Sequence, residues 1–359
     1  MRLLAAILLF VLTLPVVAQD RRTRNVVLIT LDGLRWQELF SGIDPLLMSA
    51  KAAHMEEAGA LRERLWRSTT EERREALMPF FWGSFAPKGA VYGNVARGSS
   101  VKVTNGYMVS YPGYSEILTG RAQDDVIQGN AKVRNPTPSV LQFLRGRLKL
   151  PREKVAIFGS WELFDWIGES EPGSIVINSG YKAFTEPGAT ARAKELSGMQ
   201  FRILSPWDSV RHDFFTFELA MDYLKSRRPR LLHIAFGETD DWAHDRRYDR
   251  VLQSIEYFDR CLRELWTWIE RTPGYKGATS VVITVDHGRG STLEDWSSHG
   301  RKVQGAEQIW IALAGPDTPA RGEVSGGPEF YQRDVAPTIL DLLGVPHTEY
   351  TGVQGKPIR

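Results

Sequence analysis

The chain has 359 residues, enough to bury about 75% of its unfolded surface, so a large core needs neither disulfides nor structural metals to stay folded. Its 45 lysines and arginines nearly balance 43 aspartates and glutamates, which leaves a formal net charge of +2. No basic run is long enough to follow a phosphate backbone, which argues against a nucleic-acid-binding surface. A single cysteine, Cys261, excludes an intramolecular disulfide.

The N-terminal residues have the pattern of a secretory signal peptide. A positive start, Met1-Arg2, is followed by an apolar stretch from Leu3 to Val17 and then by the small residue Ala18. The pattern predicts a leader over residues 1–19, cleavage near Ala18 or Gln19, and export to the periplasm or the medium. The stretch is shorter than the roughly 20 residues of a spanning helix, although an uncleaved anchor is an alternative. No later segment is predicted to span a membrane, and the oligomeric state is not predicted.

Short β-branched runs recur before helical segments in the remaining chain, residues 20–359. Such alternation predicts an α/β fold, a three-layer α/β/α sandwich around a mostly parallel central sheet in one domain. The runs are Val26–Ile29, Val155–Phe158, Leu231–Phe236 and Val281–Val285.

Residues from about 41 to 100 interrupt this pattern and are predicted to form an insertion beside the active face. The segment contains a charged helical stretch, Ala52–Arg74, and an aromatic patch, Phe80–Trp82. Trp82 either packs against the neighbouring helix or lines a substrate pocket. Further along, Cys261 falls on the apolar side of a helical pattern and is predicted to be a core residue rather than a nucleophile.

Acidic and imidazole side chains follow three of the predicted strands. Asp32, Asp240 and the pair Asp286-His287 each come shortly after a strand ends, where open α/β sheets bind their ligands. His244 shares a helical face with Asp240, and His299 follows in Ser-His-Gly. Three carboxylates and three imidazoles are enough for two metal sites, and this mixture suits Zn²⁺, with Mn²⁺ or another divalent ion as alternatives.

A candidate nucleophile begins a short predicted helix. Ser110 lies at or near its N-cap, Pro112 in its first turn, and Gly120 just past its end. Ser110 either only caps the helix or presents its hydroxyl where unpaired amides and the helix dipole favour an alkoxide and an incoming phosphate.

Taken with the metal ligands, this segment resembles the nucleophile motif of the alkaline phosphatase superfamily, especially its nucleotide pyrophosphatase/phosphodiesterase branch. In that branch a Thr or Ser precedes an aromatic-Pro pair and a helix ending in Thr-Gly, as Ser110 does here. The other motifs follow in the family's order and span about Asn25 to Val345. They are Asp32 after the first strand, Asn130, Asp240-x-x-x-His244, Asp286-His287-Gly288, Ser298-His299-Gly300 and the late segment Asp334–Gly344.

The resemblance implies a role for each of these residues. One ion would be held by Asp240, His244 and His299, and the other by Asp32, Asp286 and His287, with Ser110 bound to the second ion. Asp241 and Asp245 are near enough in sequence to confuse this assignment, and Asp241 is the alternative ligand. Ser110 would form a phosphoserine, while Asn130 would donate to a phosphoryl oxygen.

Departures from the family narrow the expected activity. Tyr114 stands where the sulfatase branch has an arginine, which disfavours sulfatase activity. No equivalent is found for the cations of bacterial phosphomonoesterases, although Arg121 and Arg301 are candidates. Trp161, with Tyr111 and Tyr114, would tolerate an organic group on the phosphate.

The leading hypothesis is therefore an exported, divalent-metal-dependent hydrolase of small-molecule phosphoric esters, of phosphodiesterase or nucleotide pyrophosphatase type. Phosphomonoesterase activity is the first alternative, and phosphoryl transferase or mutase activity is the second. A secreted binding protein with a decayed site is the least favoured hypothesis, because neither a ligand nor the nucleophile is missing.

Overall fold

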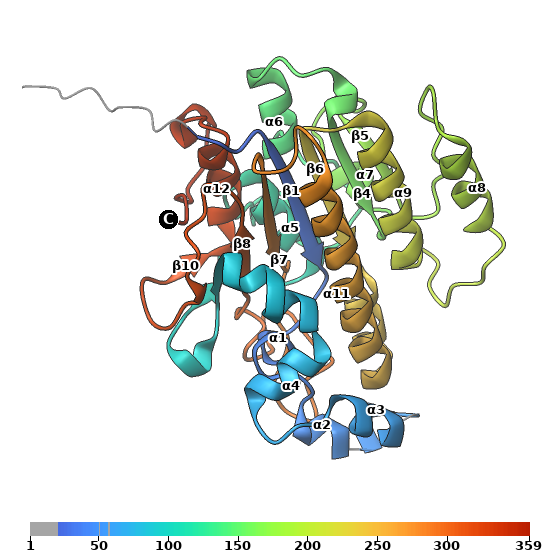
Figure 1. Cartoon of the computed structure of the whole chain (residues 1–359), viewed down its shortest axis with the longest axis vertical. Helices are drawn as coiled ribbons and strands as arrows, with labels where there is room; N and C mark the ends of the chain where they lie inside the picture. The colour runs from blue at the N-terminus through green and yellow to red at the C-terminus, as the bar shows by residue number, and fades with distance from the viewer. Residues whose placement is uncertain (1–20, 50, 57) are drawn as a thin grey trace, which may run out of the picture.

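A computed structural model describes residues 21–49, 51–56 and 58–359. Its central sheet has eight strands in the order β5-β4-β6-β1-β7-β8-β2-β9. In that order they are Val176–Ser179, Val155–Gly159, Leu231–Phe236, Asn25–Leu31, Thr279–Thr284, Ile311–Ala314, Gly89–Tyr92 and Gly322–Glu323. The part of this order from β5 to β8 can be followed in Figure 1. A second sheet pairs β3 (Val101–Lys102) with β10 (Phe330–Tyr331).

The centre of the sheet is parallel, as the buried β-branched runs predict. β1 pairs in parallel with β6 on one side and with β7 on the other, and β4 and β5 continue the parallel arrangement. β8 then runs antiparallel to both β7 and β2. The carboxyl ends of β6, β1 and β7 therefore lie side by side at one edge of the sheet.

Helices cover both faces of the sheet, which confirms the predicted three-layer architecture (Figure 1). The long helix α11 (Tyr248–Arg271) buries the apolar stripe that includes Cys261, which is 4% exposed. The α-helices after the insertion are α5 (Ser110–Thr119), α6 (Val140–Arg147), α7 (Phe164–Ile167), α8 (Ala191–Met199), α9 (Asp213–Arg227), α10 (Glu238–His244), α11 (Tyr248–Arg271) and α12 (Val335–Leu342).

The segment predicted as an insertion differs from the prediction in two respects. Helix α1 (Trp36–Ser41) ends where the segment begins, and the segment contains α2 (Pro45–Ser49), α3 (Ala58–Leu65) and α4 (Thr70–Leu77). The prediction of a single charged helix over Ala52–Arg74 is wrong, because Thr69 forms a capping box with Glu72 and a new helix begins there. Gly89–Tyr92, inside the predicted range, is β2 of the main sheet.

Trp82 packs rather than lining a pocket. Its ring is 7% exposed, its Nε1 donates to the carbonyl of Leu39, and the Arg74 guanidinium lies 3.7 Å from the ring centroid. Of the two roles that the sequence left open for Trp82, the structure shows packing.

Two predictions concern membranes and export. Across the described part of the chain, no helix combines the length and the apolar character needed to cross a bilayer. The predicted leader over residues 1–19 lies outside the described residues.

Candidate active site

Three neighbouring strands deliver the three acidic side chains to one place. Asp32 directly follows β1, Asp286 comes two residues after β7, and Asp240 lies in α10, which begins two residues after β6. Because β6, β1 and β7 are parallel neighbours, their carboxyl ends bring these side chains together although the chain separates them by up to 254 residues.

His287 lies at the centre of this group. Its Nε2 is 3.4 Å from Asp32 Oδ1, 3.4 Å from Asp286 Oδ2 and 3.7 Å from Asp240 Oδ1. Its Nδ1 lies 3.0 Å from the carbonyl oxygen of Gly288, which fixes the ring. Asp32, Asp286 and His287 therefore form one group whose ligand atoms are close enough to share an ion.

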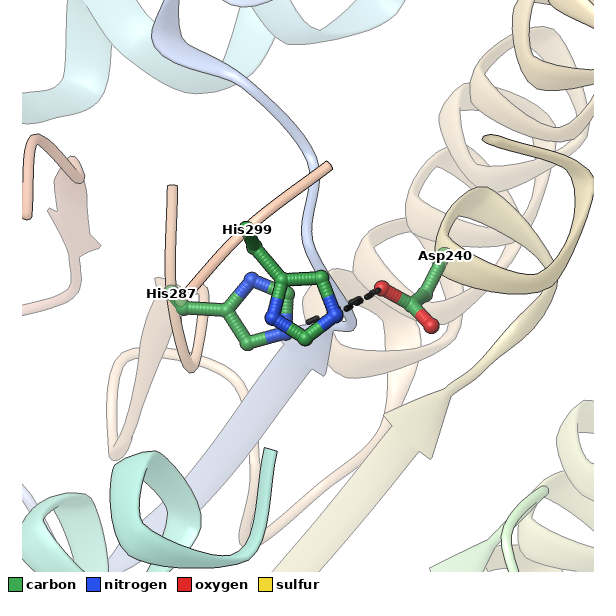
Figure 2. Close-up of side chains that lie close together, drawn as sticks. All are labelled: Asp240, His287 and His299. Carbon is green, nitrogen blue, oxygen red and sulfur yellow. Dashed lines mark ion pairs between the residues drawn. The ribbon is translucent and has the colours of Figure 1, made fainter. Parts of the chain in front are cut away.

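A second group lies on the other side of His287. The ring of His299 stacks on that of His287 with centroids 3.8 Å apart, and both rings point toward Asp240 (Figure 2). His299 Nε2 is 3.8 Å from Asp240 Oδ1 and 3.1 Å from His244 Nε2. His244 Nε2 is also 3.1 Å from Asp240 Oδ2, because the two residues share one face of α10. The side chains expected to hold the other ion are thus together.

The side chains fit divalent cations. Asp286 is fully buried, and its Oδ2 has no hydrogen-bond partner among the described residues. Three carboxylates this close in a buried place favour cations beyond the Arg289 guanidinium that pairs with Asp240, since a buried anion without a partner is costly. Carboxylate oxygens and imidazole nitrogens are the donors that Zn²⁺ and related ions accept. Exposure increases from Asp286 and His287, both 0%, to the His244 side chain, 50%, so the site opens toward His244.

The pKa values reflect the same crowding. Burial and the charge of Asp32 raise the pKa of Asp286 well above its ordinary value. Although burial opposes a charged ring, Asp286 and Asp32 raise the pKa of His287 to about 9. Burial and then the positive charge of His287 lower the pKa of His244 and of His299. Without ions, His287 therefore adds a positive charge to that of Arg289, which pairs with Asp240, and the lowered pKa values favour neutral rings at His244 and His299.

We expect zinc affinity to rise with pH up to about 9. An imidazole must be neutral to bind an ion, so binding must displace the proton of His287. The native pKa of His287, about 9, lies above its reference value of 6.5, so its protonation stabilises the metal-free fold below pH 6.5 and this stabilisation is lost as the pH rises through 9. Calorimetric zinc titrations at pH 6.5, 7.5 and 9, with melting of the chelated protein at each pH, measure both effects. A pH-independent affinity would contradict the assignment of His287 as a ligand.

The candidate nucleophile borders the Asp32 group. Ser110 is the first residue of α5 and is 5% exposed, and its Oγ is 3.5 Å from both Asp32 Oδ1 and His287 Nε2. Gly113 permits this approach, because a Cβ there would lie 2.1 Å from the carbonyl oxygen of Asp286. A larger residue would push α5 away from the end of β7.

Asn130 lies beside the nucleophile. Its Oδ1 accepts a hydrogen bond of 2.9 Å from the backbone N–H of Tyr111, the residue after Ser110. Because Oδ1 of Asn130 accepts this hydrogen bond, the Nδ2 group of the side chain remains as a donor. The structure thus brings together Ser110, Asn130 and the six side chains proposed from the sequence as further metal ligands.

Several secondary expectations are not met. Tyr111 and Tyr114 are 0% and 1% exposed, and the Tyr114 hydroxyl donates to Asp32 Oδ2, so neither ring can contact an organic group of a substrate. Arg121 follows the far end of α5, about 15 Å along the helix from Ser110, and donates to Thr137. It cannot act as the phosphate-binding cation.

Asp241, the alternative to Asp240, has a different environment. A Cβ placed on Gly237 would lie 3.6 Å from Asp241 Oδ2, which puts this carboxylate beside the start of α10 rather than among the imidazoles. Burial and the charge of Asp32 raise the pKa of Asp241 to about 8. The geometry therefore favours Asp240 as the ligand.

Sequence reasoning missed two residues of the site, Gly113 and Arg289. The buried Arg289 side chain donates to both the carbonyl and a carboxylate oxygen of Asp240. Its position directly after Asp-His-Gly is the signal that could have identified it.

The C-terminal part of the chain matches a family of metal-dependent enzymes. Residues 215–347 match the model of the metalloenzyme superfamily, and this range includes Asp240, His244 and His299. The 2,3-bisphosphoglycerate-independent phosphoglycerate mutase of Acaryochloris marina is 30% identical over 138 residues, which are 37% of this chain. The match spans only 24% of the mutase.

Solved structures match nearly the whole chain at low sequence identity. A variant of the alkaline phosphatase PafA covers 94% of this chain and 98% of its own, with a TM-score of 0.57 and 10% identity. The chain has an alkaline phosphatase-like fold. A putative sulfatase from Bacteroides thetaiotaomicron, with 94% and 74% coverage, a TM-score of 0.58 and 13% identity, shares this alkaline phosphatase-like fold. The comparisons support the metalloenzyme superfamily and do not single out the nucleotide pyrophosphatase branch.

Proposed function

We propose that this protein is a metal-dependent hydrolase of phosphoric esters that acts through a phosphoserine at Ser110. The observation that carries the proposal is the position of Ser110 Oγ, 3.5 Å from a buried carboxylate and from a buried imidazole that belong to a candidate metal site. The secretory pattern of residues 1–19 supports the further proposal that the enzyme works outside the cytoplasm.

The ligand assignment is part of this proposal. Asp32, Asp286 and His287 would hold one divalent ion, and Asp240, His244 and His299 the other, with Zn²⁺ the metal best suited to these donors. When bound, such a pair of ions lowers the pKa of a nucleophile and stabilises both oxygens of an in-line displacement.

The chain's own residues position the substrate and take part in both steps. The N-terminal end of α5 favours an anionic phosphate beside Ser110, and Asn130 donates to a non-bridging oxygen. Ser110 gives its proton to solvent, its Oγ forms a bond to phosphorus, and the bond from phosphorus to the leaving oxygen breaks with its electron pair remaining on that oxygen. Water then attacks phosphorus, the phosphoserine bond breaks, and Ser110 regains a proton.

The charges around the site support a diester substrate over a monoester. Lys132 is paired with Glu162 at 2.6 Å, Arg289 with Asp240, and the Arg301 guanidinium lies 4.3 Å from the ring centroid of Tyr107. The buried Arg289 is committed to Asp240, and the exposed Lys132 and Arg301 contact neighbouring side chains rather than Ser110, whereas a terminal phosphate carries an extra negative charge that needs a cation beside the nucleophile. A diester has no such requirement.

A substrate panel tests the proposal. The protein loaded with zinc is assayed with a bis-aryl phosphate, an aryl phosphate, an aryl sulfate and a dinucleotide. We expect kcat/KM for the bis-aryl phosphate to exceed that for the aryl phosphate by at least about tenfold, which corresponds to about 1.4 kcal/mol, and the sulfate to react slowest. If the monoester reacts faster than the diester, the protein is a phosphomonoesterase rather than a phosphodiesterase. If the sulfate reacts faster than both phosphoric esters, the proposal is contradicted.

Phosphoryl transfer is a second candidate, favoured by the partial match to phosphoglycerate mutases. The same phosphoserine would then pass its phosphoryl group to an alcohol instead of water. Product analysis with added glycerol distinguishes the two, since a transferase gives a glycerol phosphate ester and a hydrolase gives mainly the hydrolysed product.

A further inference from the structure

A single buried guanidinium contacts the segments that carry the proposed ligands. Arg289 is 2% exposed and donates through Nε to the carbonyl of Gly33 at 3.1 Å and through Nη1 to the carbonyl of Ser297 at 2.5 Å. Its Nη2 donates to the carbonyl of Asp240 at 3.3 Å and also to Asp240 Oδ1.

These acceptors belong to different parts of the site. Gly33 is adjacent to Asp32, Ser297 precedes His299 by two residues, and Arg289 itself follows His287 by two residues. With the two contacts to Asp240, the Arg289 side chain therefore connects the four segments that carry the proposed ligands of both ions.

The surrounding backbone leaves space for this side chain and no more. Gly33 has a φ of +56°, and a Cβ there would lie 2.8 Å from Arg289 Nε and 2.9 Å from Arg289 Nη2. On the far side, Arg35 donates to the carbonyl of Gly290 at 3.2 Å and pairs with Glu38, so the chain after Arg289 is also held. A planar guanidinium is the side chain that can donate in several fixed directions at once, which an ammonium cannot do.

We infer that Arg289 is a positioning residue that fixes Asp240 and sets the spacing of the two ligand groups, an inference that rests on the proposed function. The guanidinium holds Asp240 Oδ1 and leaves Oδ2, 3.1 Å from His244 Nε2, to complete the group of Asp240, His244 and His299. Its hydrogen bonds to the Gly33 and Ser297 carbonyls keep the Asp32 and His299 segments at a constant distance from Asp240.

The test compares the Arg289→Lys and Arg289→Met variants with the wild-type protein. Zinc binding is measured by calorimetry, and the coordination at the site is measured by the visible absorption of the cobalt-loaded protein. We expect both variants to bind one of the two ions about 10- to 100-fold more weakly and to show an altered cobalt spectrum, because outer hydrogen bonds to metal ligands have effects of this size. At saturating zinc, kcat falls while KM changes by less than about threefold, since Asp240 is displaced and the substrate contacts remain.

Arg211→Lys is the matched control. Arg211 is also fully buried and donates to Asn178 and Thr216, away from the ligand groups. We expect this control to lower Tm with unchanged zinc affinity, which separates a loss of buried hydrogen bonds from a loss of positioning. Arg289→Lys decides the test if the methionine variant does not fold.

Two ions bound with unchanged affinity and an unchanged cobalt spectrum in Arg289→Lys would overturn the inference. Because zinc binding is measured without a substrate, this result is distinct from failure of the proposed function. A protein that binds two zinc ions through Arg289-positioned ligands, but hydrolyses no phosphoric ester, would contradict only the proposed function.

Discussion

Replacing Ser110 with alanine is expected to lower kcat/KM for a bis-aryl phosphate by about 10⁴-fold or more while both ions remain bound. The hydroxyl lies 3.5 Å from Asp32 and His287, so the substitution removes the nucleophile and leaves six ligand side chains in place. Loss of a catalytic serine has effects of this order in other enzymes, because hydrolysis must then proceed by direct attack of water. Initial rates and the zinc content of the purified variant measure the two parts of the prediction.

Ser110→Thr is the control for this substitution. It keeps a hydroxyl at the first residue of α5 and is expected to retain measurable turnover, whereas alanine retains almost none. Acid quenching of the unchanged protein with labelled substrate should also trap a phosphate on Ser110. Turnover of the alanine variant within tenfold of the unchanged protein, with both ions bound, would remove Ser110 from its proposed role.

Asp240→Asn is expected to reduce zinc binding from two ions per chain to one and to lower kcat/KM by about 10³-fold. Asp240 Oδ2 is 3.1 Å from His244 and Oδ1 is 3.8 Å from His299, so the amide removes the negative ligand that the two imidazoles share. A catalytic ion contributes several kcal/mol to stabilisation of the transition state, and each 1.36 kcal/mol is a factor of ten. Metal analysis after dialysis and initial rates measure the effect.

The adjacent aspartate provides the control. The Asp241 carboxylate lies beside Gly237 at the start of α10 rather than among the imidazoles, so an amide there leaves the six proposed ligands in place. We expect Asp241→Asn to keep two ions and to retain kcat/KM within about tenfold. If the Asp241→Asn variant loses an ion and the Asp240→Asn variant does not, Asp241 rather than Asp240 is the metal ligand.

Much of the sheet could be predicted from local sequence. The runs at Leu231–Phe236 and Val155–Phe158 are buried on both faces, so continuous apolar and β-branched residues identified them as parallel strands. The same holds for the runs Val26–Ile29 and Val281–Val285, after which Asp32 and Asp286 follow, because a charged residue shortly after a buried run marks the end of a strand. The positions of Asp32 and Asp286 near strand ends could therefore be predicted from the local sequence alone.

Other features depended on contacts that sequence periodicity does not contain. β2, residues 89–92, joins the sheet through pairing with β8, which lies more than 200 residues later. The exposure of Tyr111 and Tyr114 depended on how closely α5 approaches the end of β7, a distance that Gly113 permits. Each outcome was decided by side chains far away in the chain.

The sequence by itself determined the layered α/β architecture, the candidate nucleophile and the set of acids and imidazoles, because buried strands, helix ends and motifs are local patterns. Only the tertiary structure showed which oxygens and nitrogens approach one another, that Asp240 rather than Asp241 faces the imidazoles, and that Arg289 joins the ligand segments. The physical reason is that side-chain direction and burial are set by the packing of β6, β1 and β7 against distant helices and loops, and these contacts form only when the whole chain has folded.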